Sequence, residues 1–283
     1  MGVSKIPLIF FSIALLTIAG IFLFKSMNIK SVPASVIDTK ENIEWNINNQ
    51  KPEVKESLID KTIKAIYITS WSASKESYID YVIDLANDSE INGVVIDIKD
   101  WSGYVGYNSS LTQVKDYGAK SIRIKDIKSL LERLHNEGIY TIGRITVFQD
   151  PVLAKARPDL AIYNAQATSS LWVDNSGLAW IDPASKDCWD YNIAIAKEAV
   201  DLGFDEINFD YVRFPSDGDL SLMGFPFWDG KTLKHLVIRD FFKRIREKLP
   251  NAKLSVDLFG LSTISYRDFG VGQIIEDAFG QQP

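Results

Sequence analysis

The stretch GFDEINFDYVRFP, residues 203–215, alternates polar and apolar side chains in the way that predicts a β-strand. Asn208 and Asp210 share one parity, and Ile207 and Phe209 share the other. A strand between two helix layers is apolar on both sides, whereas a barrel strand packs one side under helices and turns the other inward. The stretch therefore favours a barrel of alternating strands and helices.

Two further stretches repeat this alternation. Asp97 shares its parity with Lys99, and Asp257 shares its parity with Ser255, while the residues between them are apolar. Charged side chains inside a barrel are costly unless they pair or take part in chemistry. We therefore expect them near the carboxyl ends of the strands, where the active sites of such barrels lie.

Beyond residue 62, predicted strands alternate with predicted helices. The strands are expected at Ile63–Ser70, Gly93–Lys99, Ile139–Thr146, Glu206–Val212 and Leu254–Phe259. The helices are expected at Lys75–Asp88, Ile122–Glu137, Lys186–Leu202 and Leu233–Lys248. The alternation predicts parallel strands with crossover helices, and hence an α/β fold of the (β/α)8 TIM-barrel type. Because five strands do not close an eight-stranded barrel, we expect a barrel that is incomplete at its C-terminus.

The insert Pro158–Pro183 interrupts the alternation. Its Asn-Ser-Gly sequence at residues 175–177 predicts a β-hairpin on a long loop after the third strand. Trp172 and Trp180 lie on this insert, and we expect them to overhang the barrel mouth and stack on sugar rings, with core packing as the alternative.

The N-terminal region has a different composition. Ile6–Phe24 is an uncharged and mainly apolar run, long enough to span a bilayer. We expect residues 1–25 to form a membrane anchor, with a cleaved signal segment as the alternative, and residues 26–61 to form a polar spacer. Residues 62–283 would then be a barrel domain outside the cell, held by a single membrane pass or, in the alternative, secreted.

The composition bounds the chemistry. The net charge of −6 disfavours a nucleic-acid partner, since such proteins usually carry a basic surface. One cysteine, Cys188, and two histidines give poor support to a disulfide framework, a histidine-based mechanism or a metal site, so we expect no metal and no cofactor. Aspartates at the ends of the strands are the remaining candidates for catalytic groups.

Two carboxylates across a cleft are the minimum set for cleaving a glycosidic bond. Asp210 and Asp257 are the predicted catalytic pair; a purely structural ion-pair network is the alternative. The side chains expected to bind and orient the substrate are Asp97, Lys99, Arg144, Trp172, Trp180, Asn208 and Arg213.

The motif at residues 203–215 resembles the signature of a bacterial family described as a "putative glycosyl hydrolase domain", related to the α-amylase-like barrels. Further matching segments are GVVIDIKD at 93–100, Arg144 with FQDP at 148–151, WIDP at 180–183 and SVDLFG at 255–260. The resemblance implies a nucleophilic Asp at the end of the fourth strand, which is Asp210, and an acid/base at the end of the fifth, which is Asp257 in place of the usual Glu. The resemblance implies a glycoside hydrolase, and we expect it to act on an extracellular or cell-wall polysaccharide; a non-catalytic carbohydrate-binding protein on the same fold is the rival.

Overall fold

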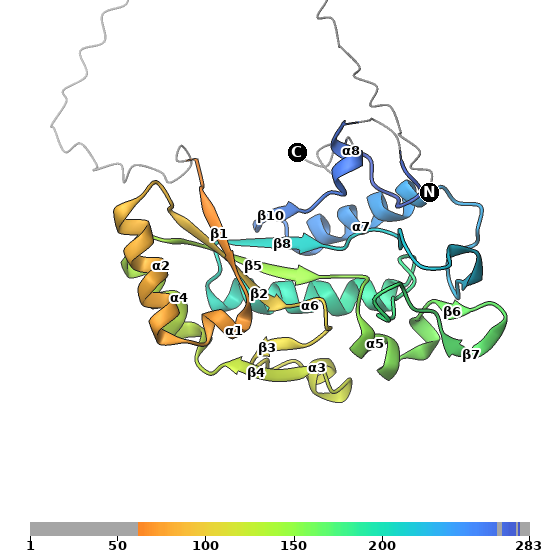
Figure 1. Cartoon of the computed structure of the whole chain (residues 1–283), viewed down its shortest axis with the longest axis horizontal. Helices are drawn as coiled ribbons and strands as arrows, with labels where there is room; N and C mark the ends of the chain where they lie inside the picture. Colours follow the sequence, from red (N-terminus) through yellow and green to blue (C-terminus); the bar gives the residue numbers. More distant parts are fainter. Residues whose placement is uncertain (1–61, 265–267, 276, 278–283) are drawn as a thin grey trace, which may run out of the picture. The chain divides into compact units, whose positions relative to one another are not determined.

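The computed structural model describes residues 62–264, 268–275 and 277. Five parallel strands form its centre (Figure 1): β1 (Ala65–Ile68), β2 (Gly93–Lys99), β5 (Tyr140–Thr146), β8 (Glu206–Asp210) and β10 (Lys253–Val256). Each pairs in parallel with the next along the chain, so that β1, β2, β5, β8 and β10 lie in sequence order. All five occur where strands are predicted, with ends that differ by a few residues. A barrel has this sequential order, whereas a doubly wound sheet reverses direction at a switch point.

Helices connect successive parallel strands, as crossover connections require. They are α2 (Glu76–Asp88), α4 (Ile127–Asn136), α6 (Lys186–Leu202) and α7 (Lys234–Lys248). The bounds of α6 are those predicted. Ser185 caps its first turn by accepting from Cys188 N, and Gly203 ends it in the left-handed conformation, with φ of 113°.

The structure contains elements that the pattern did not predict. Residues 122–124, expected to be helical, belong to strand β4 (Lys120–Ile124). β4 pairs with β3 (Val105–Tyr107), and β3 joins the end of β2 in antiparallel register at Lys99. The short helices are α1 (Ser70–Ala73), α3 (Thr112–Asp116), α5 (Pro151–Ala156) and α8 (Gly260–Ile264), with 3-10 turns at Pro158–Leu160 and Leu220–Leu222.

The insert forms a small antiparallel sheet. Strands β6 (Tyr163–Asn164) and β7 (Ala167–Leu171) form a hairpin that turns at residues 165–166, and β9 (Met223–Gly224) pairs with the other side of β6. The insert is thereby tied to the segment that follows β8. The predicted turn at residues 175–177 is present, but only an isolated antiparallel bridge between Val173 and Ala179 flanks it.

A β-bulge in β2 changes the direction of Lys99. Asp97 lies opposite Arg144 of β5, but Lys99 lies opposite Ile145, so two steps on β2 match one step on β5. The prediction that Asp97 and Lys99 share a face is therefore wrong. Lys99 is fully buried and forms an ion pair with Asp150, with 2.8 Å between Nζ and Oδ2.

None of the helices in the described part of the chain is long and apolar enough to cross a membrane. The expected membrane span at residues 6–24 and the spacer at 26–61 lie outside the described residues, so both stay predictions.

Candidate active site

Arg144 of β5 is the centre of a charged cluster on the inward side of the strands. Its Nη1 donates to Oδ1 of Asp97 at 2.5 Å, and its Nη2 donates to Oδ2 of Asp210. Its Nε lies 3.7 Å from Oδ2 of Asp257. One guanidinium thus contacts carboxylates from β2, from β8 and from the residue after β10, as the parity of these strands predicts.

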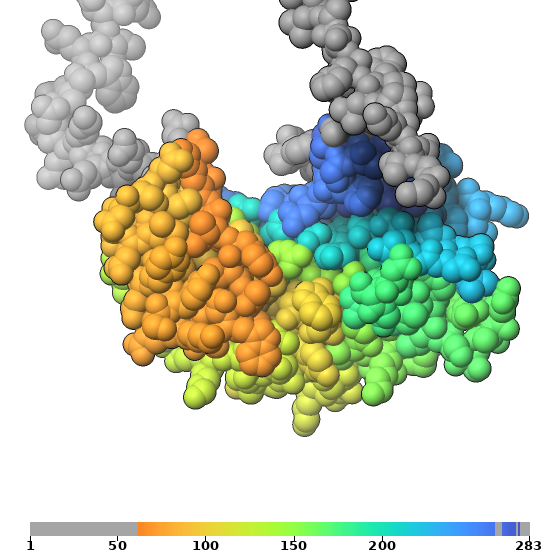
Figure 2. Space-filling view, in the orientation of Figure 1, coloured from red at the N-terminus to blue at the C-terminus, as the bar shows by residue number. Residues whose placement is uncertain are grey.

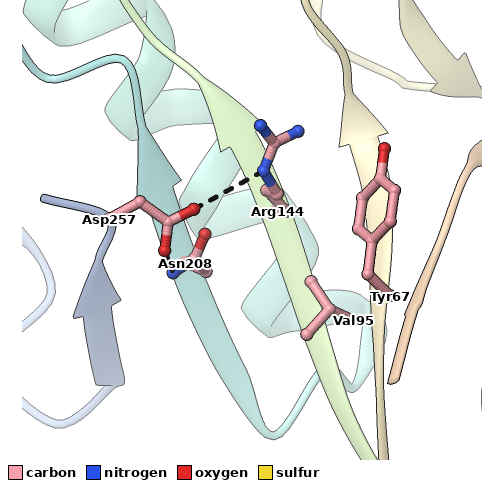
Figure 3. Close-up of a pocket in the computed structure, with 5 residues that line it drawn as sticks. All are labelled: Tyr67, Val95, Arg144, Asn208 and Asp257. Atoms are coloured by element: carbon pink, nitrogen blue, oxygen red, sulfur yellow. Dashed lines mark hydrogen bonds and ion pairs between the residues drawn. The ribbon is translucent and has the colours of Figure 1, made fainter. Parts of the chain in front are cut away.

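An open cavity of about 460 Å³ lies beside the guanidinium, lined by Tyr67, Val95, Arg144, Asn208 and Asp257. Figure 3 shows these side chains arriving from successive parallel strands, with Asp257 beside Asn208 and directed toward Arg144. Tyr67 of β1 was missed by the sequence reasoning, although its position between Ile66 and Ile68 assigns it to the inward parity. Its hydroxyl donates to Oδ2 of Asp97 at 2.5 Å.

A second cavity of about 230 Å³ brings the predicted catalytic pair together. Asp210 and Asp257 both line it, beside Arg213 and Gln273. The exposed fractions of the carboxyl side chains rise from 2% at Asp97 to 21% at Asp210 and 50% at Asp257. A ligand in the cavities can therefore reach Asp210 and Asp257, whereas Asp97 is covered and can act only by holding Arg144 and Tyr67.

The backbone after β8 fixes Asp210. Tyr211 has a φ of 52°, which is uncommon and strained for a residue with a side chain. The Tyr211 amide donates to Oδ1 of Asp210, at 2.5 Å. Val147 N donates to the Asp210 carbonyl at 2.9 Å. Strain of this kind persists only where the surroundings enforce it, and here it lies in the residue next to a carboxylate at the cavity.

Asp257 is held more loosely. Asn208 donates from Nδ2 to Oδ1 of Asp257 at 3.2 Å, and the Asp257 amide donates to the Phe209 carbonyl at 2.9 Å. Gln273, another residue that the sequence reasoning missed, donates to the carbonyls of Val212 at 3.0 Å and of Asp257 at 3.3 Å. It thereby connects the segments that follow β8 and β10.

The electrostatics give the carboxyls different properties. Burial raises the pKa of Asp257, and the charge of Asp210 raises it further, against the lowering effects of Asn208 and Arg144. Burial also raises the pKa of Asp97, although the hydrogen bond from Tyr67 and the charge of Arg144 oppose this. Burial alone would lower the pKa of Arg144, but the charges of Asp97 and Asp210 outweigh it and raise that pKa.

Arg213 lies at the edge of the same cavity. Its guanidinium carbon is 5.0 Å from the ring centre of Trp180 and 5.1 Å from that of Tyr211. It donates to the Phe214 carbonyl at 3.2 Å and to Ser216 Oγ at 3.0 Å. Burial lowers the pKa of Arg213, against the raising effects of nearby acidic groups and of Tyr211.

Three of the predicted substrate-binding residues are placed differently. Lys99 is fully buried and pairs with Asp150 because of the bulge in β2, and it lines neither of the two cavities described above. Trp172 and Trp180 are 3% and 2% exposed. Their indole N–H groups are bonded inside the fold, to the Asp219 carbonyl at 2.8 Å and to Asp174 Oδ2 at 2.9 Å. The prediction of exposed sugar platforms on the insert is therefore wrong, and the alternative of core packing holds.

Within the described ranges, no group of three or more His, Cys, Asp or Glu side chains could hold a metal ion. That a metal takes no part in the chemistry stays a prediction.

Residues 65–281 match the model of a family described as "Putative glycosyl hydrolase domain". A crystal structure of a hypothetical protein from Ruminiclostridium thermocellum is 43% identical, with a TM-score of 0.63 over 69% of this chain and 98% of that one. The α-L-fucosidase isoenzyme 2 from Paenibacillus thiaminolyticus is 15% identical, with a TM-score of 0.51 over 70% of this chain and 32% of that enzyme, a likeness of fold. The search among curated proteins found no match.

Proposed function

Because the chain belongs to the family described as "Putative glycosyl hydrolase domain", we propose that it hydrolyses glycosidic bonds in a polysaccharide through Asp210 and Asp257. The observation that carries the proposal is the placement of both carboxyls on one cavity and against one guanidinium. A purely structural ion pair does not require a half-exposed carboxyl beside an open cavity, whereas a hydrolase does.

The carboxyls would divide the chemistry by their surroundings. Asp210, oriented by Arg144 and the Tyr211 amide, attacks the anomeric carbon as the glycosidic C–O bond breaks. Asp257, whose pKa burial and Asp210 raise, gives its proton to the leaving oxygen. A water then loses a proton to Asp257 and displaces Asp210 from the anomeric carbon, which restores both groups.

The finer features of the fold and the location belong to the same proposal. The sequential order of the five strands supports a barrel of the (β/α)8 type. The apolar run at residues 6–24 supports a membrane anchor that places the domain outside the cell, beside cell-wall polysaccharide. Proteolysis of intact cells tests the location, because a domain that resists protease until the cells are lysed would contradict it.

The test of the activity uses Asp210→Asn in the full chain, with a panel of bacterial cell-wall and extracellular polysaccharides and release of reducing ends as the readout. The matched control is Asp116→Asn, an exposed aspartate on α3. We expect Asp210→Asn to lose at least about 1,000-fold in turnover, in line with the loss of a nucleophile, and the control to keep it. Cleavage at the original rate by folded Asp210→Asn would exclude the proposed role, and binding without any turnover by the parent protein would favour the carbohydrate-binding rival.

A further inference from the structure

One largely buried ion pair supports two exposed tryptophans. Arg123 of β4 pairs through Nη1 with Oδ2 of Asp100, and the two side chains are 6% and 11% exposed. Trp71 of α1 lies over this pair, with its ring centre 4.7 Å from the Arg123 guanidinium carbon. Trp101 is the residue next to Asp100. Trp71 and Trp101 are 60% and 53% exposed.

The backbone beneath each indole is fixed. Arg123 Nη1 donates to Oγ of Ser70, the residue before Trp71, at 2.8 Å. Asp100 accepts from Ser102 N at 3.0 Å, and Gly103 N donates to the Asp100 carbonyl at 2.9 Å, which closes a tight turn around Trp101. Gly103 has a φ of 84°, and a Cβ there would lie 2.2 Å from Oδ1 of Asp150. Glycine is therefore required at the corner that holds Trp101 out.

Exposure of these indoles is unusual within the same fold. Trp172, Trp180 and Trp189 are 2–5% exposed, and each donates its indole N–H to a partner inside the protein. Large aromatic side chains that stay exposed on a rigid base lose little conformational entropy when they bind, which is why they serve as anchors at binding surfaces. A cation beneath the Trp71 ring also leaves its other face open for a ligand.

The location connects the two indoles with the active site. Trp71 follows β1 and Trp101 follows β2, at the same carboxyl edge of the parallel strands that carries Asp210 and Asp257. α1 lies close to β3, since a Cβ at Gly106 would come within 2.8 Å of Ser70 Cβ. Figure 1 shows α1 beside β2 and β3, and in Figure 2 the orange surface of the segment that holds α1 adjoins the yellow surface of the segment that holds β3. Tyr67 of β1, 53% exposed, lines the larger of the two cavities and precedes Trp71 in the same segment of the chain.

We propose that Trp71 and Trp101 form a binding platform for sugar rings of the polysaccharide chain, away from the bond that is cut. The C–H faces of a pyranose ring pack against an indole, and its hydroxyls remain in water, which suits half-exposed rings better than a dry protein interface does. The proposal rests on the proposed function for its class of ligand. In this proposal the platform binds the extended substrate chain, and Asp210 and Asp257 cleave the bond.

The test measures binding rather than turnover, in full-length protein that carries Asp210→Asn. Protein-free and lipid-free bacterial cell walls serve as the probe in a sedimentation assay, with indole fluorescence as a second readout. The variants Trp71→Ala and Trp101→Ala are each expected to weaken binding about tenfold, or about 1.4 kcal/mol. Trp71→Phe, which keeps a ring over Arg123, is expected to weaken it less.

Tyr81→Ala is the matched control, because Tyr81 is 55% exposed on α2 and belongs to neither cavity. Unchanged affinity in both tryptophan variants, or an equal loss in the control, would overturn the proposal, as would absence of binding by the parent. Vesicles of phosphatidylglycerol test a membrane contact; if the tryptophan variants lose vesicle binding and keep cell-wall binding, the surface serves the membrane. Because Asp210→Asn removes turnover from every arm, a platform that binds sugar survives even if the proposed hydrolysis fails.

Discussion

Replacement of Arg144 by Met tests the charged cluster directly. Met keeps most of the volume of the side chain and removes the charge that contacts Asp97, Asp210 and Asp257. The main consequence falls on Asp97, which is 2% exposed and keeps only the hydrogen bond from Tyr67. Loss of one partner from a buried ion pair leaves the other charge uncompensated, which costs about 3–5 kcal/mol.

The other two contacts add less. The Asp210 side chain is 21% exposed, so water compensates part of its loss. Asp257 is half exposed and lies 3.7 Å from Nε, and exposed pairs contribute about 0–1 kcal/mol. We therefore expect Arg144→Met to lose about 3–5 kcal/mol of unfolding free energy near neutral pH, a large part of the about 5–15 kcal/mol typical of a domain.

The loss should depend on pH with a definite sign. Burial already raises the pKa of Asp97, and Arg144 opposes this, so its removal raises the pKa of Asp97 further. The penalty is then present above that pKa, where the carboxyl is charged, and is relieved as the pH falls through it. Urea denaturation of parent and variant between pH 4 and pH 8 measures the difference, with Arg144→Lys and the double variant Asp97→Asn/Arg144→Met as companions.

The double variant should recover part of the loss, because it removes the uncompensated charge. A loss below about 1 kcal/mol at neutral pH, or a loss that is the same at all pH values, would refute the reasoning. If Asp97 is buried and depends on Arg144, the loss must be large and must depend on pH.

Three further predictions concern single positions. Asp257→Asn should remove the alkaline limb of the pH–activity profile, because the general acid must be protonated. The same variant should stabilise the fold slightly at neutral pH but not at low pH, because the raised pKa of Asp257 means that its charged form is the unfavourable one. Thermal melts that show equal effects at both pH values would contradict this. Lys99→Met should lower the unfolding free energy by about 3–5 kcal/mol, because the buried charge of Asp150 loses its partner, and Lys99→Met/Asp150→Asn should recover part of the loss. The KM of the folded fraction should not change; a raised KM would indicate that Lys99 binds the substrate. Trp180→Ala should cost about 3–5 kcal/mol, and Trp180→Phe less, in denaturant titrations, and a stable Trp180→Ala with weakened sugar binding would argue against core packing.

The parity of polar side chains predicted much of the candidate site. Asn208 and Asp210 on β8, Asp97 on β2 and Asp257 after β10 all face the side that their alternation assigns, and Arg144 meets three of the carboxyls. Alternation is reliable here because a parallel strand with one side under helices must repeat every second residue.

The alternation of polar and apolar residues gives the wrong direction for Lys99. A bulge inserts one residue and reverses the direction of everything after it, and nothing in GVVIDIKD distinguishes a bulged strand from a regular one. Trp172 and Trp180 show a second limit. A tryptophan on a loop can be a binding platform or the core of an excursion, and the decision depends on Asp174 and Asp219, whose acceptor groups are brought to the indoles only by the folded insert.

The cluster around Arg144 carries more negative than positive charge. Three carboxyls contact a single guanidinium, so full ionisation would leave two uncompensated negative charges, and a shared proton relieves part of that repulsion. Asp97 accepts from both Tyr67 and Arg144 and would lose an acceptor position on protonation, whereas Asp257 has the looser contacts and Asp210 as neighbour. The proton is therefore favoured on the most exposed of the three carboxyls, which is the position from which it can be given to a substrate. Burial and the neighbouring charge of Asp210 raise the pKa of Asp257, and Arg144 donates to the same Asp210, so the acid and the nucleophile of the proposed mechanism would arise from one arrangement.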